Sequence, residues 1–132
     1  MSASTPQEVF GPVISSYSRA QAIEDGVLVD VSKMAKEAGF IFNVAVTRAV
    51  WDGYITPDER SRPLGQSEDG RLWDTLWMLR MAIKRLQAQG QLYYRLYYIQ
   101  KARQKRLVTL KAHCGPGDQG EPVITIMLPE ED

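Results

Sequence analysis

The chain contains the run Leu92-Tyr93-Tyr94-Arg95-Leu96-Tyr97-Tyr98-Ile99, in which leucine or tyrosine occupies every even-numbered position. Successive side chains of a β-strand point to opposite faces of the sheet. One face of this strand would therefore carry leucines and tyrosines, and the other would carry Tyr93, Arg95 and Tyr97. The run predicts a strand with an apolar inner face and a basic, aromatic outer face.

Two later runs continue this alternation and predict two more strands. The strands Leu92–Gln100, Leu107–Cys114 and Val123–Leu128 would form a three-stranded antiparallel meander. Its inner face would collect Leu92, Tyr94, Leu96, Tyr98, Val108, Leu110, Ala112, Cys114, Ile124, Ile126 and Leu128. Its outer face would collect Tyr93, Arg95, Tyr97, Thr109, Lys111, His113 and Thr125.

A long amphipathic helix is predicted at Arg71–Gln89, immediately before the meander. Apolar residues recur at spacings of three and four at Leu72, Leu76, Leu79, Ile83 and Leu86. A second stripe holds Trp73, Trp77 and Met81. Tryptophan is highly buried on average, so we expect this stripe to be core as well. The combined arc is wide and would need two neighbouring elements to cover it.

The first half of the chain alternates short strands and short helices. Strands are predicted at Val13–Tyr17, Val27–Val31 and Phe40–Val46, with helices at Arg19–Asp25, at Lys33–Ala38 and after Thr47. Ser18, Ser32 and Thr47 each precede a helical run and are predicted N-caps, whose hydroxyls accept from the first free amides. Gly26 and Gly39 follow the first two helices and are predicted to end them in a left-handed conformation.

Length and composition indicate a single domain, because 132 residues with 44% hydrophobic content suffice for one ordinary core. The predicted fold class is α+β, with the C-terminal meander packed on the long helix. The domain would span residues 13–128, after a flexible segment at 1–12 and before an acidic tail at 129–132. Proline and glycine break the polar stretch near 56–70, which predicts a mobile loop.

Charge is distributed unevenly along a chain whose formal net charge is zero. Between Thr75 and Gly117 there are nine lysines and arginines and no aspartate or glutamate. Zero net charge argues against indiscriminate coating of nucleic acid, which requires many phosphates to be neutralised at once. Two interpretations stay open: the acidic and basic regions pack against each other, or the basic region binds a partner.

The binding interpretation selects the basic, tyrosine-rich face and the turn beside it. The candidate binding residues are Tyr93, Arg95, Tyr97, Lys101, Arg103, Lys105, Arg106 and Lys111. Tyrosine and arginine are enriched at protein interfaces, which favours a protein partner. The same residues could stack unpaired bases and hold phosphates, so a single-stranded nucleic-acid-binding module is the alternative. The sequence assigns no oligomeric state.

Catalytic, metal and membrane sites have little support in the sequence. Cys114 is the only cysteine, and its neighbour His113 would point to the opposite face of the strand, so no nucleophile pair is predicted. One histidine and one cysteine cannot build a structural zinc site, and we expect no metal, cofactor or catalytic residue. The chain has no apolar run long enough for a membrane span and begins without a signal-peptide pattern, which predicts a cytoplasmic protein.

An enzymatic alternative comes from a loose likeness to ADP-ribosyltransferases. Tyr17-Ser18-Arg19 on the first strand and Glu121 before the last one resemble the strand-borne Tyr, Ser, Arg and Glu that line the cleft of those enzymes. The likeness implies a transferase with a cleft near Tyr17, Arg19 and Glu121. Its remaining motifs are absent from this sequence.

Three stretches together resemble a known family. They are Val13-Ile14-Ser15-Ser16-Tyr17-Ser18-Arg19-Ala20-Gln21-Ala22-Ile23-Glu24-Asp25-Gly26-Val27-Leu28-Val29-Asp30-Val31-Ser32, Gly70-Arg71-Leu72-Trp73-Asp74-Thr75-Leu76-Trp77-Met78 and Cys114-Gly115-Pro116-Gly117-Asp118. The family consists of small bacterial proteins of unknown function carried on plasmids, integrative elements and phages. The resemblance implies a mobile-element cargo protein acting on a host or element-encoded protein or nucleoprotein complex. Such cargo includes transfer accessories and inhibitors of host defence, such as anti-CRISPR proteins.

Overall fold

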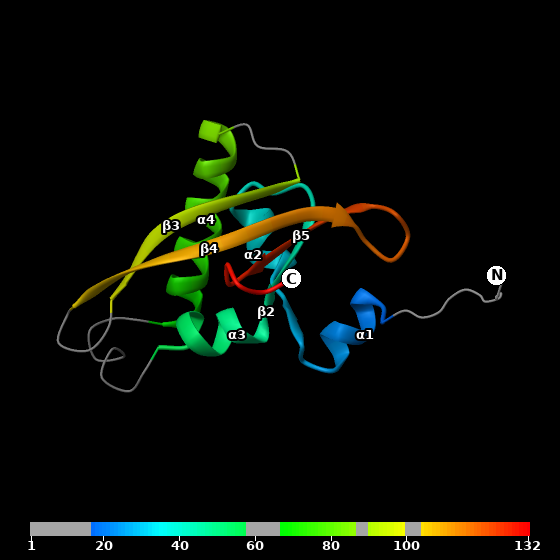
Figure 1. Cartoon of the computed structure of the whole chain (residues 1–132), viewed down its shortest axis with the longest axis horizontal. Helices are drawn as coiled ribbons and strands as arrows, with labels where there is room; N and C mark the ends of the chain where they lie inside the picture. The colour runs from blue at the N-terminus through cyan, green and yellow to red at the C-terminus, as the bar shows by residue number, and fades with distance from the viewer. Residues whose placement is uncertain (1–16, 58–66, 87–89, 100–103) are drawn as a thin grey trace.

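The structure is a computed structural model that describes residues 17–57, 67–86, 90–99 and 104–132. Its described part is one α+β domain, as predicted, built on a five-stranded mixed sheet with strand order β1-β2-β5-β4-β3 (Figure 1). The strands are β1 (Leu28–Asp30), β2 (Asn43–Thr47), β3 (Gln91–Ile99), β4 (Lys105–Pro116) and β5 (Pro122–Met127). Among the described residues, no helix is both long enough and apolar enough to span a membrane.

The C-terminal meander is confirmed. β3 pairs antiparallel with β4 in a register that sets Arg95 opposite Thr109, and β4 pairs antiparallel with β5. β5 also pairs in parallel with β2, with Val44 opposite Ile124. This parallel pair joins the two halves of the chain, and β1 completes the sheet by antiparallel pairing with β2.

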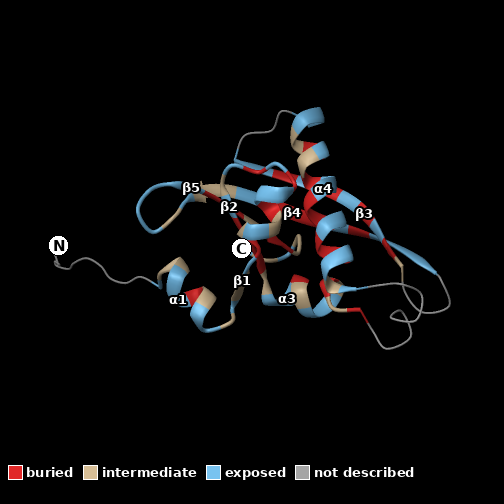
Figure 2. Cartoon of the chain, turned by 180° about the vertical axis from the view of Figure 1, so that it is seen from behind, coloured by how far each residue is buried: buried red, intermediate tan, exposed pale blue. Residues whose placement is uncertain are grey.

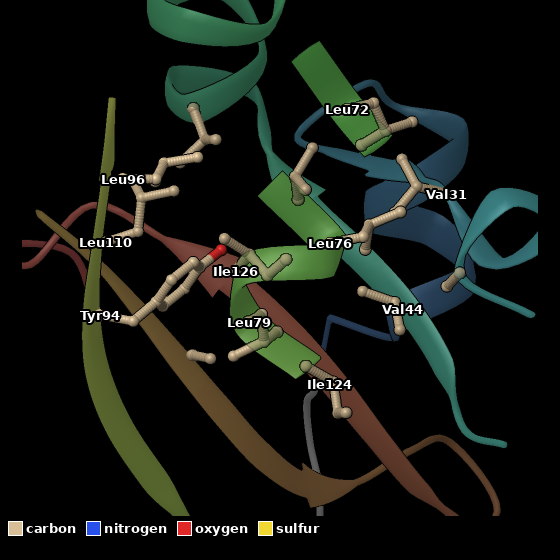
Figure 3. Close-up of a cluster of buried hydrophobic side chains, with 14 of the residues drawn as sticks. Val31, Val44, Leu72, Leu76, Leu79, Tyr94, Leu96, Leu110, Ile124 and Ile126 are labelled. Carbon is tan, nitrogen blue, oxygen red and sulfur yellow. The ribbon is translucent and has the colours of Figure 1, made fainter. Parts of the chain in front are cut away.

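Helix α4 (Glu68–Leu86) crosses the inner face of the sheet and builds the core with it. Leu76, Leu79 and Leu110 are fully buried, and Leu96 is 3% exposed. Figure 3 shows these side chains interleaved between α4 and strands β2 to β5. The inner face predicted from the alternation is therefore confirmed, with Cys114 and Leu128 as partly buried members of the same layer.

The second stripe of α4 is not core, and the prediction of its burial is wrong. Trp73, Trp77 and Met81 are each nearly 40% exposed, and Leu86, the last member of the first stripe, is half exposed. The two indole rings stack on each other, with centroids 5.9 Å apart. No second described element covers this side of the helix, so α4 is buried on its sheet side and exposed on the other (Figure 2).

A polar network inside the core fixes α4 to β3. The Thr75 hydroxyl donates to the backbone carbonyl of Arg71 and lies 2.5 Å from the Tyr98 hydroxyl. The Tyr94 hydroxyl donates to the Thr75 carbonyl at 3.0 Å. The Arg71 guanidinium is buried and donates to the backbone carbonyls of Tyr54 and Ile99. These bonds satisfy the buried polar groups and hold β3 in one register against the helix.

The short helices of the first half lie where they were predicted, to within one residue at each end. They are α1 (Arg19–Glu24), α2 (Ser32–Glu37), α3 (Arg48–Val50) and η1, a π-helical turn at Trp51–Ile55. Ser18 and Thr47 cap α1 and α3 by accepting from the amides of Gln21 and Val50. Gly26 and Gly39 have the expected positive φ angles after α1 and α2.

The prediction that Ser32 caps α2 is wrong. Ser32 is the first residue of α2, and its hydroxyl donates to the Asp30 carboxylate and accepts from the Val44 amide. The side chain therefore ties α2 to β2 and does not cap a helix. The strand predicted at Val27–Val31 is shorter, at Leu28–Asp30, and it lies at an edge of the sheet with Leu28 and Val29 half-buried.

Several predicted boundaries shift. The strand expected at Phe40–Val46 runs instead over Asn43–Thr47, and α4 begins at Glu68, inside the predicted 56–70 loop. Other predictions lie outside the described residues. They are the segment 1–12, most of the predicted strand Val13–Tyr17, residues 58–66 of the loop and the helix end at 87–89. Tyr17 itself is described and belongs to no strand.

Candidate functional site

The outer face of β3 exposes the residues that the alternation placed there. Tyr93 is 50% exposed and Tyr97 60% exposed, and Arg95 between them is also exposed. Their partners across the ladder on β4 are Lys111, Thr109 and Leu107. Because the even-numbered residues of β3 are held in the core, the fold fixes the direction of these three side chains.

The remaining candidate residues do not all share that face. Lys105 is exposed and pairs with Ile99, which places it on the outer side with Arg95. Arg106 is exposed but pairs with Tyr98, so it lies on the inner side, where its guanidinium sits 5.7 Å from the centre of the Tyr54 ring. Lys101 and Arg103 lie outside the described residues. We use the name basic tyrosine surface for Tyr93, Arg95, Tyr97 and Lys105.

Lys111 lies on the outer face but is only 8% exposed. Its ammonium donates to the backbone carbonyl of Glu131. The Glu131 carboxylate in turn accepts from the Thr47 hydroxyl and the Leu128 amide, each at 2.8 Å. Lys111 therefore fastens the acidic tail to the sheet and is not part of the exposed basic tyrosine surface.

Helix α1 is fastened to β5 on the outer face of the sheet. The Arg19 guanidinium donates to the Thr125 hydroxyl at 2.7 Å and to the Ile124 carbonyl at 2.8 Å. The Asp118 carboxylate accepts from the backbone amides of Arg19 and Ala20 at the start of the helix. These backbone hydrogen bonds lower the pKa of Asp118. The side chains of Arg19 and Asp118 therefore hold α1 against the sheet.

The residues of the transferase hypothesis are not gathered in one cleft. The Tyr17 hydroxyl donates to Asp25 at 2.6 Å, and Tyr17 lines an open depression of about 850 Å³ beside His113 and the C-terminal segment. Arg19 and Glu121 line a different cavity of about 150 Å³. A cavity of that size is smaller than the few hundred Å³ usual for a small-molecule site.

Two depressions border β3, with α4 on one side and the outer face of β4 on the other. One has a volume of about 290 Å³ and is lined by Asp74, Trp77, Met78, Arg95, Leu96, Tyr97 and Leu107. The other, of about 450 Å³, is lined by Arg85, Tyr93, Tyr94, Arg95, Tyr97, Leu107 and Thr109. We call the two together the β3–α4 groove. The groove meets the basic tyrosine surface at Arg95 and Tyr97, which line both depressions.

The charged groups of the groove are one acid and two arginines. Partial burial raises the pKa of Asp74. Arg85 and Arg95 are exposed, and the Arg80 guanidinium lies 5.7 Å from the centre of the Trp77 ring on the adjoining helix surface. The site therefore presents cations and aromatic rings to solvent, a composition typical of binding surfaces.

His113 and Cys114 point to opposite faces, as predicted. His113 is exposed on the outer face, and Cys114 is partly buried against the core. Within the described residues, no three histidine, cysteine, aspartate or glutamate side chains converge in a way that could hold a metal ion.

The helix side of the groove was not predicted from the sequence. Trp77 was expected in the core and Met78 was given no structural role, yet both line the groove and are nearly 40% exposed. A signal for this was present, since the apolar arc of α4 is wider than one sheet can cover.

The chain matches no curated protein and no solved structure. A family model described as "Family of unknown function (DUF6573)" matches residues 9–132, and the chain therefore belongs to that family.

Proposed function

We propose that this protein is a non-catalytic binding protein that recognises an acidic partner through the basic tyrosine surface. The observation that carries the proposal is the exposure of Tyr93, Arg95 and Tyr97 on a strand whose other face is fully committed to the core. Tyrosine and arginine supply much of the binding energy at protein interfaces. Large rings left half-exposed on a rigid strand lose little conformational entropy when a partner covers them.

The setting we propose is a plasmid, integrative element or phage in a bacterial cytoplasm. There the protein would act on a host or element-encoded protein or nucleoprotein complex, for example as an inhibitor of host defence of the anti-CRISPR kind. The resemblance of its three sequence stretches to mobile-element cargo supports this setting. A basic surface suits both kinds of target, because nucleoprotein complexes and acidic proteins each present negative charge.

A single-stranded nucleic-acid-binding module is the second candidate. Tyr93 and Tyr97 flank Arg95 on one face and lie roughly 13 Å apart along an extended strand. Two rings with a cation between them could stack two bases and hold the phosphate between them. The transferase alternative has no comparable support, because Tyr17 and Glu121 line separate cavities.

A pair of matched charge reversals tests the proposal. The tagged protein is purified from cells of its bacterial host, with and without nuclease treatment, and its bound partner is identified. The test variant is Arg95→Glu with Lys105→Glu. The control is Lys33→Glu with Lys36→Glu, which reverses two exposed cations on α2 and changes the net charge equally.

We expect the test variant to lose the partner and the control to keep it. The remaining binding should depend less on salt, because fewer ions are released or screened on association. Loss of the partner after nuclease treatment alone would select the nucleic-acid candidate. Equal retention by both variants, with unchanged melting temperatures, would reject the basic tyrosine surface as the binding site.

A further inference from the structure

Strand β3 lies at one end of the sheet, so one of its two edges pairs with β4 and the other does not pair with any described strand (Figure 1). An unpaired edge presents backbone N–H and C=O groups that can template another strand. The pairing pattern tells which residues of β3 present those groups.

The backbone hydrogen bonds divide β3 by residue parity. The Cys114 amide donates to the Gly90 carbonyl at 2.6 Å, in line with the ladder in which Gln91 lies opposite His113. Hydrogen-bonded and non-hydrogen-bonded pairs alternate along an antiparallel ladder. The even-numbered residues of β3 therefore bond to β4, and the odd-numbered residues direct their N–H and C=O groups to the open edge. The bond from Arg71 to the Ile99 carbonyl fits this division.

The open backbone groups therefore belong to Tyr93, Arg95 and Tyr97, the same residues whose side chains form the outer face. The β3–α4 groove borders these residues, with Trp77 and Met78 on its helix side and Leu107 and Thr109 of β4 on its outer-face side. An edge strand with a groove beside it is the arrangement that receives an added peptide strand in known recognition modes.

An added strand would place its own side chains alternately on two sides. Those on the inner side would meet Trp77, Met78 and the ring of Tyr94, which favour apolar residues. Those on the outer side would meet Tyr93, Arg95 and Tyr97. Arg85 and Arg95 outnumber Asp74 among the charged residues that line the groove, so the charge favours an acidic segment.

We propose that the partner contacts this protein with an extended, acidic polypeptide segment that adds to β3 as a sixth strand of the sheet. Apolar and acidic residues alternate along this segment. The apolar residues enter the groove beside Trp77 and Met78, and the acidic residues pair with Arg95. This inference rests on the proposed function, because it names the partner class for the same surface. A second copy of the chain fits poorly, since antiparallel pairing of two β3 edges centred on Arg95 would set this arginine against its counterpart.

A displayed library of random 12-residue peptides supplies the probe. The wild-type protein is the bait, and a bait with Arg95→Glu and Lys105→Glu is the counter-selection. We expect enriched peptides that alternate acidic and apolar residues. Each enriched peptide is then synthesised and its affinity for the wild-type protein measured.

Amide hydrogen exchange locates the bound peptide. In the complex, the amides of Tyr93, Arg95 and Tyr97 should become protected, because each gains an acceptor on the added strand. The amides of Tyr94 and Leu96 already bond to β4 and should change little. This alternation is a signature that contact through side chains alone would not produce.

A matched pair of variants isolates the backbone contribution. Tyr97→Ala removes the ring and keeps the N–H, whereas Tyr97→Pro removes both and leaves the ladder with β4 intact, since proline is tolerated where the N–H faces away from the sheet. The proline variant should bind the peptide about tenfold more weakly than the alanine variant, because it lacks one backbone hydrogen bond. Equal melting temperatures of the two variants serve as the control for folding, and the exchange experiment decides the matter if the proline variant unfolds.

The outcomes separate this inference from the proposed function. Enriched acidic peptides that protect the three amides support strand addition. Peptides that bind without protecting them, or that bind both Tyr97 variants equally, overturn strand addition and leave the basic tyrosine surface as a binding site. A library that yields no peptide, or protection of the amides in a dimer of this chain, also overturns it. The charge-reversal experiment on the partner purified from cells then judges the proposed function independently.

Discussion

Strand β3 carries two tyrosines on each face, and the two pairs are used in opposite ways. Tyr94 and Tyr98 are at most 4% exposed, and both hydroxyls bond to Thr75 of α4. Tyr93 and Tyr97 are at least 50% exposed. The residue type is the same, so position in the alternation decides which tyrosine holds the fold and which is available to a partner.

The largest expected difference between the two faces is in stability. Leu96→Ala should lower the free energy of unfolding by about 2–5 kcal/mol, because Leu96 is 3% exposed and its removal leaves a cavity. The neighbouring change Tyr97→Ala should alter it by no more than about 0.5 kcal/mol. Reversible denaturation of both variants measures the contrast. Similar values for the two would mean that the inner and outer faces are wrongly assigned.

Alternation is a local property, and it therefore predicted the meander, the two faces of β3 and the separation of His113 from Cys114. The parallel pairing of β5 with β2 was not predicted, because it joins residues about eighty positions apart and leaves no local signature. The burial of Lys111 has the same cause. It depends on the C-terminal segment folding back through Glu131, which no periodicity reports.

High pH should weaken the fold through the inner tyrosines. Burial raises the pKa of both Tyr94 and Tyr98 above the ordinary tyrosine value. Their neutral forms stabilise the native state fully below the unfolded-state pKa of about 10, and this stabilisation is lost as pH rises beyond it. Each of the two tyrosines should lower the free energy of unfolding by about 1.4 kcal/mol for every pH unit above about 10. Denaturation at a series of alkaline pH values tests this expectation. Tyr98→Phe should lose less unfolding free energy than the wild type as the pH rises.

Removing one tyrosine hydroxyl should affect stability on the inner face of β3 and not on its outer face. Tyr98→Phe removes the contact with the Thr75 hydroxyl and should cost about 0.5–1.5 kcal/mol near neutral pH. Tyr97→Phe removes an exposed hydroxyl and serves as the control. The inner network would have no measurable role in stability if both variants melted like the wild type.

The tryptophan stripe of α4 shows where residue type misleads. Average burial predicted Trp73 and Trp77 as core, but burial requires a covering element, and the described chain provides none on that side. Arg71 shows the reverse case. This charged residue is only 4% exposed, because the backbone carbonyls of Tyr54 and Ile99 accept hydrogen bonds from its guanidinium.

A smaller loss of stability is expected on the exposed helix stripe than on the inner face of β3. Trp77→Ser should lower the free energy of unfolding by less than Leu96→Ala does, because Trp77 is 39% exposed and its removal leaves no enclosed cavity. The same change should weaken partner binding, because Trp77 lines the groove beside β3. A large loss of stability would show that the ring belongs to the core after all.

An alanine scan of residues 92–98, measured for both unfolding and partner binding, tests the central claim most directly. We expect the even-numbered variants to lose stability. The odd-numbered variants should melt like the wild type within about 0.5 kcal/mol and bind the purified partner more weakly. If Tyr93→Ala, Arg95→Ala and Tyr97→Ala all bind the partner as tightly as the wild type does, the outer face of β3 is not the site of recognition.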